Sequence, residues 1–328
     1  MLVAIQKYLE IKRQSDIFWE GNLSSGRENE GRVSVVVPLY NHSSYIVDAL
    51  QSVVDQGSIV KEAIVIDDGS KDDSLRIARQ FAIDSPWIRI ASQNNSGAAV
   101  TLNRGVQMAS AEFVAILNSD DVWAPGRLDC LVRALDLDVG LDLAASDLSF
   151  INDDSVEIGN AWYEGARDSF IERRDLGLAL MDANILMTTS NFVIRRRVFD
   201  ELGGFADLRY AHDVDFALRL ILNGRRIGFI DRALMAYRVH ETNTIKENHA
   251  RVRVDWAMVA SFFLWGLLRN GSRNVERIQQ AWQILEKHDL ARAARECVRY
   301  FDAHPSATLA TSDLLADPAM KSELLLAI

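Results

Sequence analysis

The chain of 328 residues has little cysteine, no excess of positive charge and no apolar run long enough to cross a membrane. Its two cysteines, Cys130 and Cys297, are far apart and each lies in a helical pattern, so we expect buried free thiols in a reducing compartment. The formal net charge of −10 excludes nucleic acid as an expected partner, because phosphate binding requires a basic face.

The longest apolar stretch runs from Trp256 to Leu268 and is shorter than the roughly 20 residues that span a bilayer. We expect it to form a buried helix. Arginines flank the stretch, which leaves open an interfacial helix that docks on anionic lipid. The N-terminus lacks the pattern of a signal peptide. The sequence therefore predicts a cytoplasmic protein, with peripheral contact at the inner membrane face left open.

Also missing is a glycine-rich loop after the first predicted strand. Residues 38–45 contain neither Gly-x-Gly-x-x-Gly nor a glycine-rich segment that carries Lys or Arg. A dinucleotide-dependent oxidoreductase requires the first pattern, and a nucleotidyltransferase would need the second to hold a triphosphate. Both classes are therefore disfavoured.

What the sequence does contain is an alternation of strands and helices. Short apolar runs bounded by turn-forming residues predict strands, and helical spacing separates them. This alternation indicates right-handed βαβ units and a mainly parallel sheet covered by helices on both faces, with the loops after the strands at one edge. The predicted strands are 33–37, 62–66, 87–91 and 113–117, and the predicted helices are 45–54, 73–83 and 98–108.

The pattern loosens after residue 140. We expect a long polar loop at 152–168 and a helix at 171–181, and everything after residue 250 is helical in pattern. Other expected strands and helices are 143–150, 191–194, 196–202, 214–222, 226–230 and 234–239. Three regions follow from this: an N-terminal helix and linker (1–31), an α/β domain (32–249) and a helical region (250–328) that either packs on the core or forms an oligomerisation surface.

Acidic residues gather where the predicted strands end. Asn118-Ser119-Asp120-Asp121 follow the apolar run 113–117, and paired carboxylates suit a hard divalent cation that keeps ligand positions for substrate phosphates. Asp67 or Asp68 could accept a hydrogen bond from the imide N–H of uracil or thymine. Gly97 would let the backbone pass close to a ligand. Each segment also reads as an ordinary turn or helix cap.

Together these loops resemble the inverting, GT-A-fold glycosyltransferases of family 2. The resemblance extends from about Val33 to His240 and depends on the order and spacing of several motifs. It implies an α/β, GT-A-type, Rossmann-like fold with a mixed, mainly parallel sheet flanked by helices, followed by a C-terminal helical extension. The motifs are Val35–Asn41, Ile66–Asp72, Asn95–Gly97 with Asn103 and Gly105, Leu117–Trp123 with Pro125, Arg127 and Leu128, Gly203–Phe205, His212-Asp213 and Tyr237–His240.

The resemblance implies a metal-dependent, hexosyltransferase-like enzyme of bacterial polysaccharide or O-antigen synthesis. It would move a sugar from a nucleoside diphosphate donor, UDP being favoured, to a hydroxyl of a glycan or lipid-linked acceptor, with Mn²⁺ or Mg²⁺ as cofactor. The alternatives are a catalytically inactive nucleotide-sugar-binding module and a nucleotidyltransferase of similar fold.

Residue by residue, the resemblance assigns Asp121 as the direct metal ligand and Asp120 as a contact to ribose and metal. His240 either joins the metal or lies on a surface loop. Many relatives have Asp at the position of Asn118, so this chain supports a two-carboxylate site. The donor-binding residues implied are Pro38, Tyr40, Asn41, Asp67, Asp68, Gly97, Asn103, Asn118, Asp120 and Arg238.

For the acceptor side, the resemblance assigns Asp213 as the general base that deprotonates the acceptor hydroxyl. Asp213 is also a plausible helix N-cap, a role that Asp215 could equally fill. His212 would either keep the Asp213 carboxylate ionised or bond the acceptor. Gly204 and Trp162 are expected on the same side.

Overall fold

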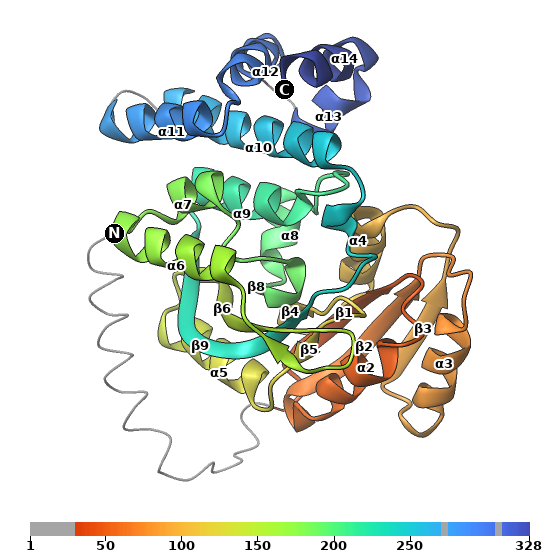
Figure 1. Ribbon diagram of the computed structural model, residues 1–328. Helices are drawn as coiled ribbons and strands as arrows, with labels where there is room; N and C mark the ends of the chain where they lie inside the picture. The colour runs from red at the N-terminus through yellow and green to blue at the C-terminus, as the bar shows by residue number, and fades with distance from the viewer. Residues whose placement is uncertain (1–29, 270–274, 306–309) are drawn as a thin grey trace.

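The computed structural model describes residues 30–269, 275–305 and 310–328 (Figure 1). The predicted N-terminal helix lies outside the described residues. Within them, the chain forms one sheet of nine strands in the order β3-β2-β1-β4-β8-β6-β9-β5, with β7 paired to β6. The strands are β1 (Val33–Leu39), β2 (Val60–Asp67), β3 (Ile88–Ser92), β4 (Phe113–Ile116), β5 (Val122–Trp123), β6 (Leu141–Ile151), β7 (Glu157–Ile158), β8 (Val193–Arg195) and β9 (Arg226–Arg238).

The sheet is mixed. Strands β1 to β4 are mutually parallel, as the βαβ alternation predicted, because helices connect them. Strand β8 then pairs antiparallel with both β4 and β6, β5 pairs antiparallel with β9, and β6 pairs parallel with β9. This arrangement confirms the expected mixed, mainly parallel sheet flanked by helices.

Helices cover both faces of the sheet and form a further layer at the C-terminus (Figure 1). One face packs against α2, α3 and α5. The other packs against α4, α7, α8 and α9, with the C-terminal helices beyond them. The helices are α2 (Ile46–Val54), α3 (Ser74–Phe81), α4 (Ala98–Met108), α5 (Arg127–Leu137), α6 (Ala161–Arg173), α7 (Leu176–Asp182), α8 (Arg197–Leu202), α9 (His212–Leu222), α10 (His249–Arg269), α11 (Val275–Lys287), α12 (Ala291–Ala303), α13 (Ala310–Ala316) and α14 (Pro318–Ala327).

The stretch from Trp256 to Leu268 lies within α10, whose residues from Val254 to Gly266 are largely buried. The expected buried helix is therefore confirmed. No helix among the described residues is long and apolar enough to cross a membrane. One apolar cluster extends from α4 through α9 and α10 to α14, so the C-terminal helices share their core with the sheet layer.

Three expectations were wrong in detail. Residues 152–168 are not a loop, because β7 and the first half of α6 lie there. The strands expected at 226–230 and 234–239 are one long strand, β9, which keeps pairing with β6 through two register shifts around Asp147. Cys297 is buried as expected, but Cys130 is only half-buried.

Candidate metal and substrate site

The loops after β1, β2, β3 and β4 meet at one edge of the sheet, as parallel strands require. Backbone hydrogen bonds between neighbouring strands continue into the first residues of these loops. The Asp68 N–H donates to the Leu39 carbonyl at 2.8 Å, and the Gln93 N–H donates to the Asp67 carbonyl at 2.9 Å. The polar side chains that follow the strands are therefore held close together.

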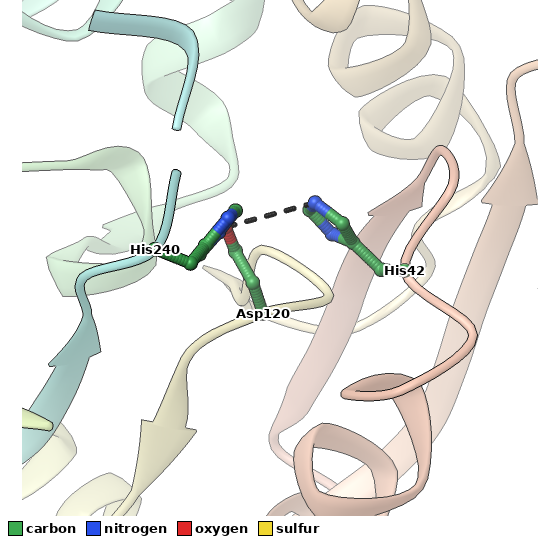
Figure 2. A group of neighbouring side chains, drawn as sticks. All are labelled: His42, Asp120 and His240. Atoms are coloured by element: carbon green, nitrogen blue, oxygen red, sulfur yellow. Dashed lines mark hydrogen bonds and ion pairs between the residues drawn. The ribbon is translucent and has the colours of Figure 1, made fainter. Parts of the chain in front are cut away.

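Three side chains from distant segments converge at this edge (Figure 2). His42 follows β1, Asp120 follows β4 and His240 follows β9, and each offers a ligand atom within 4.8 Å of the other two. His240 Nε2 lies 3.0 Å from Asp120 Oδ2, and His42 Nε2 lies 3.8 Å from the same oxygen. Among the described residues, this is the one group of His, Cys, Asp or Glu side chains with a geometry that could hold a metal ion.

The electrostatics of this group suit a cation. Burial lowers the pKa of His42, so its ring is neutral and carries a lone pair. Burial alone would raise the pKa of Asp120, but the interactions of its carboxylate with the His42 and His240 imidazoles outweigh burial, so the pKa is lowered and the carboxylate stays ionised. One carboxylate and two imidazoles form a set that Mn²⁺ accepts more readily than Mg²⁺, which prefers oxygen ligands.

Asp121 has a different environment. Its side chain is buried, Oδ2 accepts a hydrogen bond from Ser190 Oγ at 2.6 Å, and Oδ1 accepts one from the Arg238 N–H at 3.0 Å. Burial raises the pKa of Asp121 well above its ordinary range, and the charge of Asp120 raises it further. The structure does not place Asp121 in the group of three.

Arg238 has no exposed side-chain surface with which to contact a donor. Its Nε donates to the Asp120 carbonyl at 2.8 Å, and Nη1 donates to Ser155 Oγ at 2.9 Å. Nη2 forms an ion pair with Asp48 at 3.2 Å. The direct donor contact expected of Arg238 does not fit this geometry. Its observed contacts hold the backbone of Asp120 in place.

The short 3₁₀ helix η4 (Thr189–Asn191) supports the same segment from the other side. The Asn118 N–H donates to Ser190 Oγ at 2.8 Å, and Asn118 Nδ2 donates to Thr188 Oγ1 at 2.7 Å. Trp123 Nε1 donates to the Ser190 carbonyl at 2.9 Å. Asn118 therefore makes most of its possible hydrogen bonds with the protein, and few remain for a ligand.

Asp67 and Asp68 are both buried at the end of β2. Asp68 accepts hydrogen bonds from Gln93 Nε2 and from the N–H groups of Ser96 and Gly97, all between 2.8 and 2.9 Å. Asp67 accepts one bond at each oxygen, from the Ser70 N–H and from Ser92 Oγ. Asp67 therefore retains more free lone pairs than Asp68.

The loop after β1 is less enclosed. Pro38 is half-buried in β1, and Tyr40 is 40% exposed beside it. Asn41 has a positive φ of 53°, and its side-chain oxygen accepts a hydrogen bond from the Lys71 N–H at 2.7 Å. Tyr40 is thus available to a ligand at this edge. Gly97, with φ of 89°, starts α4 in a backbone conformation that favours glycine.

Asn103 belongs to the scaffold on the acceptor side. Its amide exchanges two hydrogen bonds with the backbone of Phe205, each 2.8 Å long. A Cβ atom at Gly204 would lie 2.1 Å from Asn103 Oδ1, so any larger residue there would displace the Asn103 amide from its present position. These contacts indicate that Asn103 fixes the Gly203–Phe205 turn, which differs from the donor contact expected of it.

Asp213 lies in the first turn of α9 and is 6% exposed. Oδ2 accepts a hydrogen bond from Asn184 Nδ2 at 2.8 Å, and Oδ1 accepts one from the Val214 N–H. Burial raises the pKa of Asp213, against the lowering effects of the His212 charge and the Asn184 bond. A raised pKa suits a general base that works near neutral pH.

His212 precedes the candidate base. Burial lowers the pKa of its imidazole. Its Nδ1 is buried and has no hydrogen-bond partner, and the ring meets Phe205 edge-on. Trp162, in the first turn of α6, is 55% exposed, and the described residues show no hydrogen bond between it and Asp213.

Tyr237 on β9 is affected by charges from both the Asp120–Asp121 pair and the candidate base Asp213. Burial raises the pKa of its hydroxyl, and the charges of Asp121, Asp120 and Asp213 raise it further. Hydrogen bonds link the same two groups, because Asn184 donates to Asp213 and Ser190, six residues later, donates to Asp121. One short segment therefore contacts both Asp121 and Asp213.

Reasoning from the sequence missed three residues of this site: His42, Ser190 and Asn184. His42 carried one usable signal, since it follows the first strand at the edge where ligands bind. Ser190 and Asn184 lie in a segment without a recognisable motif, and only the folded chain brings them to Asp121 and Asp213.

A model of the family described as "Glycosyl transferase family 2" matches residues 34–203. The chain belongs to this family. The membership confirms the resemblance seen in the motifs and the enzyme class, a glycosyltransferase.

Named relatives agree with this. The chain is 28% identical over 224 residues to "Uncharacterized glycosyltransferase YibD" of Escherichia coli (strain K12). The alignment covers 65% of this chain and 62% of that protein. It is also 28% identical over 218 residues to "Glycosyltransferase GlyG" of Streptococcus pneumoniae, covering 63% of this chain and 70% of the relative. The match to YibD thus spans less than two thirds of that protein.

Solved structures confirm the GT-A fold. "Mannosyltransferase PcManGT from Pyrobaculum calidifontis in complex with GDP-Man and Mn2+" aligns over 99% of this chain and 92% of its own, with a TM-score of 0.59 and 19% identity. A Staphylococcus aureus TarS fragment "in complex with UDP-GlcNAc" aligns over 87% of this chain and 91% of its own, with a TM-score of 0.55 and 18% identity. At these identities the likeness concerns the fold alone.

Proposed function

We propose that this glycosyltransferase is metal-dependent and inverting, and that it transfers a sugar from a nucleoside diphosphate to a hydroxyl of a glycan or lipid-linked acceptor. The observation that carries the proposal is the convergence of His42, Asp120 and His240 at the carboxyl edge of the sheet. The segment from Asn184 to Ser190 links the loop of Asp120 and Asp121 to the buried carboxylate of Asp213. A cation site and a base are the two components that such a displacement requires.

In this proposal Asp120, His240 and His42 hold the divalent ion, Mn²⁺ in preference to Mg²⁺. When bound, the ion offsets the negative charge that develops on the diphosphate as the sugar leaves. Asp121, which the motif assigned as direct ligand, instead fixes the geometry: its carboxylate joins Ser190 to the backbone of Arg238, and Arg238 in turn holds Asp120.

The nucleoside of the donor would lie against the loops after β1 and β2. Tyr40 offers an exposed ring for the base, and Asp67 offers free lone pairs for an imide N–H. Uracil presents such an N–H, as do thymine and guanine, so the lone pairs of Asp67 fit UDP and equally fit dTDP or GDP. The solved structures named above carry GDP-Man and UDP-GlcNAc, so both uracil and guanine donors belong in a test.

Asp213 would act as the base. Its raised pKa and its burial beside Asn184 suit removal of a proton from the acceptor hydroxyl while the diphosphate departs from the opposite face of the sugar. Inversion of the anomeric centre follows from a single displacement.

The acceptor class is suggested by relatives whose names refer to polysaccharides. The chain is 40% identical over 98 residues to "Putative teichuronic acid biosynthesis glycosyltransferase TuaG" of Bacillus subtilis, and 29% identical over 228 residues to a "Chondroitin synthase" of Escherichia coli. These names support a glycan acceptor in bacterial polysaccharide synthesis, reached at the inner face of the membrane when the acceptor is lipid-linked.

The first prediction tests donor and metal together. The purified chain is incubated with UDP-, GDP- and dTDP-sugars, a glycan acceptor and Mn²⁺, and the released nucleoside diphosphate is measured. We expect release with one donor, loss of release with EDTA and recovery when Mn²⁺ is restored. Asp120→Asn should abolish the metal-dependent release, whereas the control Asp136→Asn, which alters an exposed ion pair with Arg32, should retain it. Nucleotide binding without turnover of any donor would favour an inactive binding module.

A further inference from the structure

A C-terminal helix contacts the helix that carries the candidate base. Asp215 lies two residues after Asp213 and has no exposed surface. Its Oδ2 accepts a hydrogen bond from Arg219 Nε at 2.7 Å, and its Oδ1 accepts one from Thr311 Oγ1 at 2.8 Å. Thr311 belongs to α13 and is 1% exposed. A buried ion pair on the base helix is thus completed by a hydroxyl of a C-terminal helix.

The same ion pair extends to the turn before the base. The two terminal nitrogens of Arg219 donate to the carbonyl of Leu202 at 3.0 Å and to that of Gly204 at 2.7 Å. The Gly203–Phe205 turn and the first turn of α9 therefore share one polar anchor. Because the side chains of Asp215, Arg219 and Thr311 are all buried, removal of one of them leaves a polar atom without a replacement from water.

The loop between the turn and α9 depends on the same helices. The Asp207 N–H donates to Ser312 Oγ at 3.0 Å, and the Tyr210 N–H donates to Asp255 Oδ2 in α10 at 2.9 Å. The loop lacks regular secondary structure, so these side chains satisfy backbone groups that a strand or helix would otherwise satisfy.

A second contact reaches the base from α11. Asp182, at the end of α7, accepts hydrogen bonds from Lys287 Nζ and lies 2.7 Å from His288 Nε2. Two residues later Asn184 donates to the Asp213 carboxylate. The end of α11 thus anchors the segment that supplies the one side-chain hydrogen bond recorded for Asp213.

We propose that the C-terminal helices position the catalytic base, and that Thr311 is the positioning residue through which α13 does so. The inference rests on the proposed role of Asp213. It assigns a task to a region that lies beyond the family match at residues 34–203. A displacement of about 1 Å at a reacting group can cost roughly a hundredfold in rate, so a hydroxyl two residues from the base can control turnover without touching substrate.

The test compares Thr311→Val, which removes the hydroxyl and keeps the shape, with Thr311→Ser, which keeps the hydroxyl. Ser261→Ala is the matched control, because Ser261 is a buried C-terminal hydroxyl that donates within α10 to Ala257 and does not lead to the base. We expect Thr311→Val to lower kcat about tenfold while the calorimetric Kd for UDP with Mn²⁺ stays within about twofold, and the other two variants to resemble the parent protein.

Hydrogen–deuterium exchange of the full chain provides a readout that does not depend on activity. Peptides covering residues 203–215 should exchange faster in Thr311→Val than in Thr311→Ser or Ser261→Ala. Unchanged exchange in this segment, or an equal fall in kcat for Thr311→Val and Ser261→Ala, would overturn the proposal. If the parent protein transfers no sugar at all, the proposed function fails, and the exchange comparison alone decides whether α13 holds the loop.

Discussion

Asp120 and Asp121 are neighbours in the chain, but their carboxylates have different tasks. Asp120 faces two imidazoles, and its pKa is lowered. Asp121 is enclosed by Ser190 and the backbone of Arg238, and its pKa is raised. At the scale of single residues, burial and hydrogen bonding therefore give two chemically identical side chains pKa values that are shifted in opposite directions.

A prediction at this scale concerns Asn184. Its hydrogen bond lowers the pKa of Asp213, so Asn184→Ala should raise that pKa and move the acid limb of the kcat/KM profile to higher pH. The shift should be about one pH unit, because a hydrogen bond to a charged group contributes about 1.5 kcal/mol. Asn223→Ala, which removes a hydrogen bond at the far end of α9, is the control and should leave the profile in place. An unmoved acid limb in Asn184→Ala would count against Asp213 as the base.

A second residue-scale prediction removes the base itself. Asp213→Asn keeps the shape of the side chain and leaves the metal and nucleotide residues unchanged, so the affinity for UDP with Mn²⁺ should stay within about twofold, although its amide can accept only one of the two bonds that Asn184 and Val214 donate. Turnover should fall by about 10² to 10⁴, the usual contribution of a general base. Steady-state kinetics combined with calorimetry checks both parts. A kcat near that of the parent protein would remove Asp213 from its proposed role.

The sequence predicted which residues lie at the edge of the sheet but not which way they face. The apolar run 113–117 indicated a strand, and the following residues had to lie at its carboxyl end. Nothing in the sequence distinguishes the orientation of Asp120 from that of Asp121, because the choice depends on Ser190 and Arg238, which are distant in the chain. His42 was missed because a single histidine in a turn has no informative spacing.

At the scale of elements, α10 joins the C-terminal region to the acceptor-side loop. Its Asp255 is 4% exposed and accepts a hydrogen bond from the Tyr210 N–H. Burial raises the pKa of Asp255 to about 6, and the charge of Lys321 on α14 opposes this rise. The native state therefore holds this proton at a pH where the unfolded chain has lost it.

The consequence is a pH-dependent stability. Between about pH 4 and pH 6 the native state binds more protons than the unfolded state, so the free energy of unfolding falls as pH rises through this window. Asp255→Asn keeps an acceptor for Tyr210 and removes the titration. We expect the variant to gain about 2 kcal/mol relative to the parent protein between pH 4.5 and pH 7.5, measured as urea midpoints with equal m-values. A stability difference that is the same at both pH values would contradict the raised pKa of Asp255.

Elements with a clear period were predictable, and elements without one were not. Strands β1, β2 and β4 are apolar and bounded by turns, so their positions followed from pattern. Helix α6 lacks a consistent apolar face, with Trp162 and Ile171 both exposed, and its residues up to 168 were interpreted as loop. Strand β9 contains the polar pair Asp231-Arg232, which divided it into two predicted strands, although pairing with β6 continues past the pair.

At the scale of the whole molecule, the site lies where three layers meet. The sheet edge supplies the candidate metal ligands, the η4 and α7 segments orient Asp121 and Asp213, and the C-terminal helices hold the acceptor-side loop. The fold class was predictable because the motifs and the strand–helix alternation agree. The antiparallel insertion of β8 and the packing of α10 on α9 depend on contacts between distant segments that no local pattern reports.

The most direct test of the proposed metal site is a crystal structure with UDP and Mn²⁺ in which anomalous scattering locates the ion. We expect one anomalous peak at coordination distance from Asp120, His240 and His42 and beside the diphosphate. We also expect the Asp213 carboxylate on the opposite side of the sugar position. An ion bound to Asp121 without the two histidines, or a diphosphate outside this edge of the sheet, would contradict the proposed site.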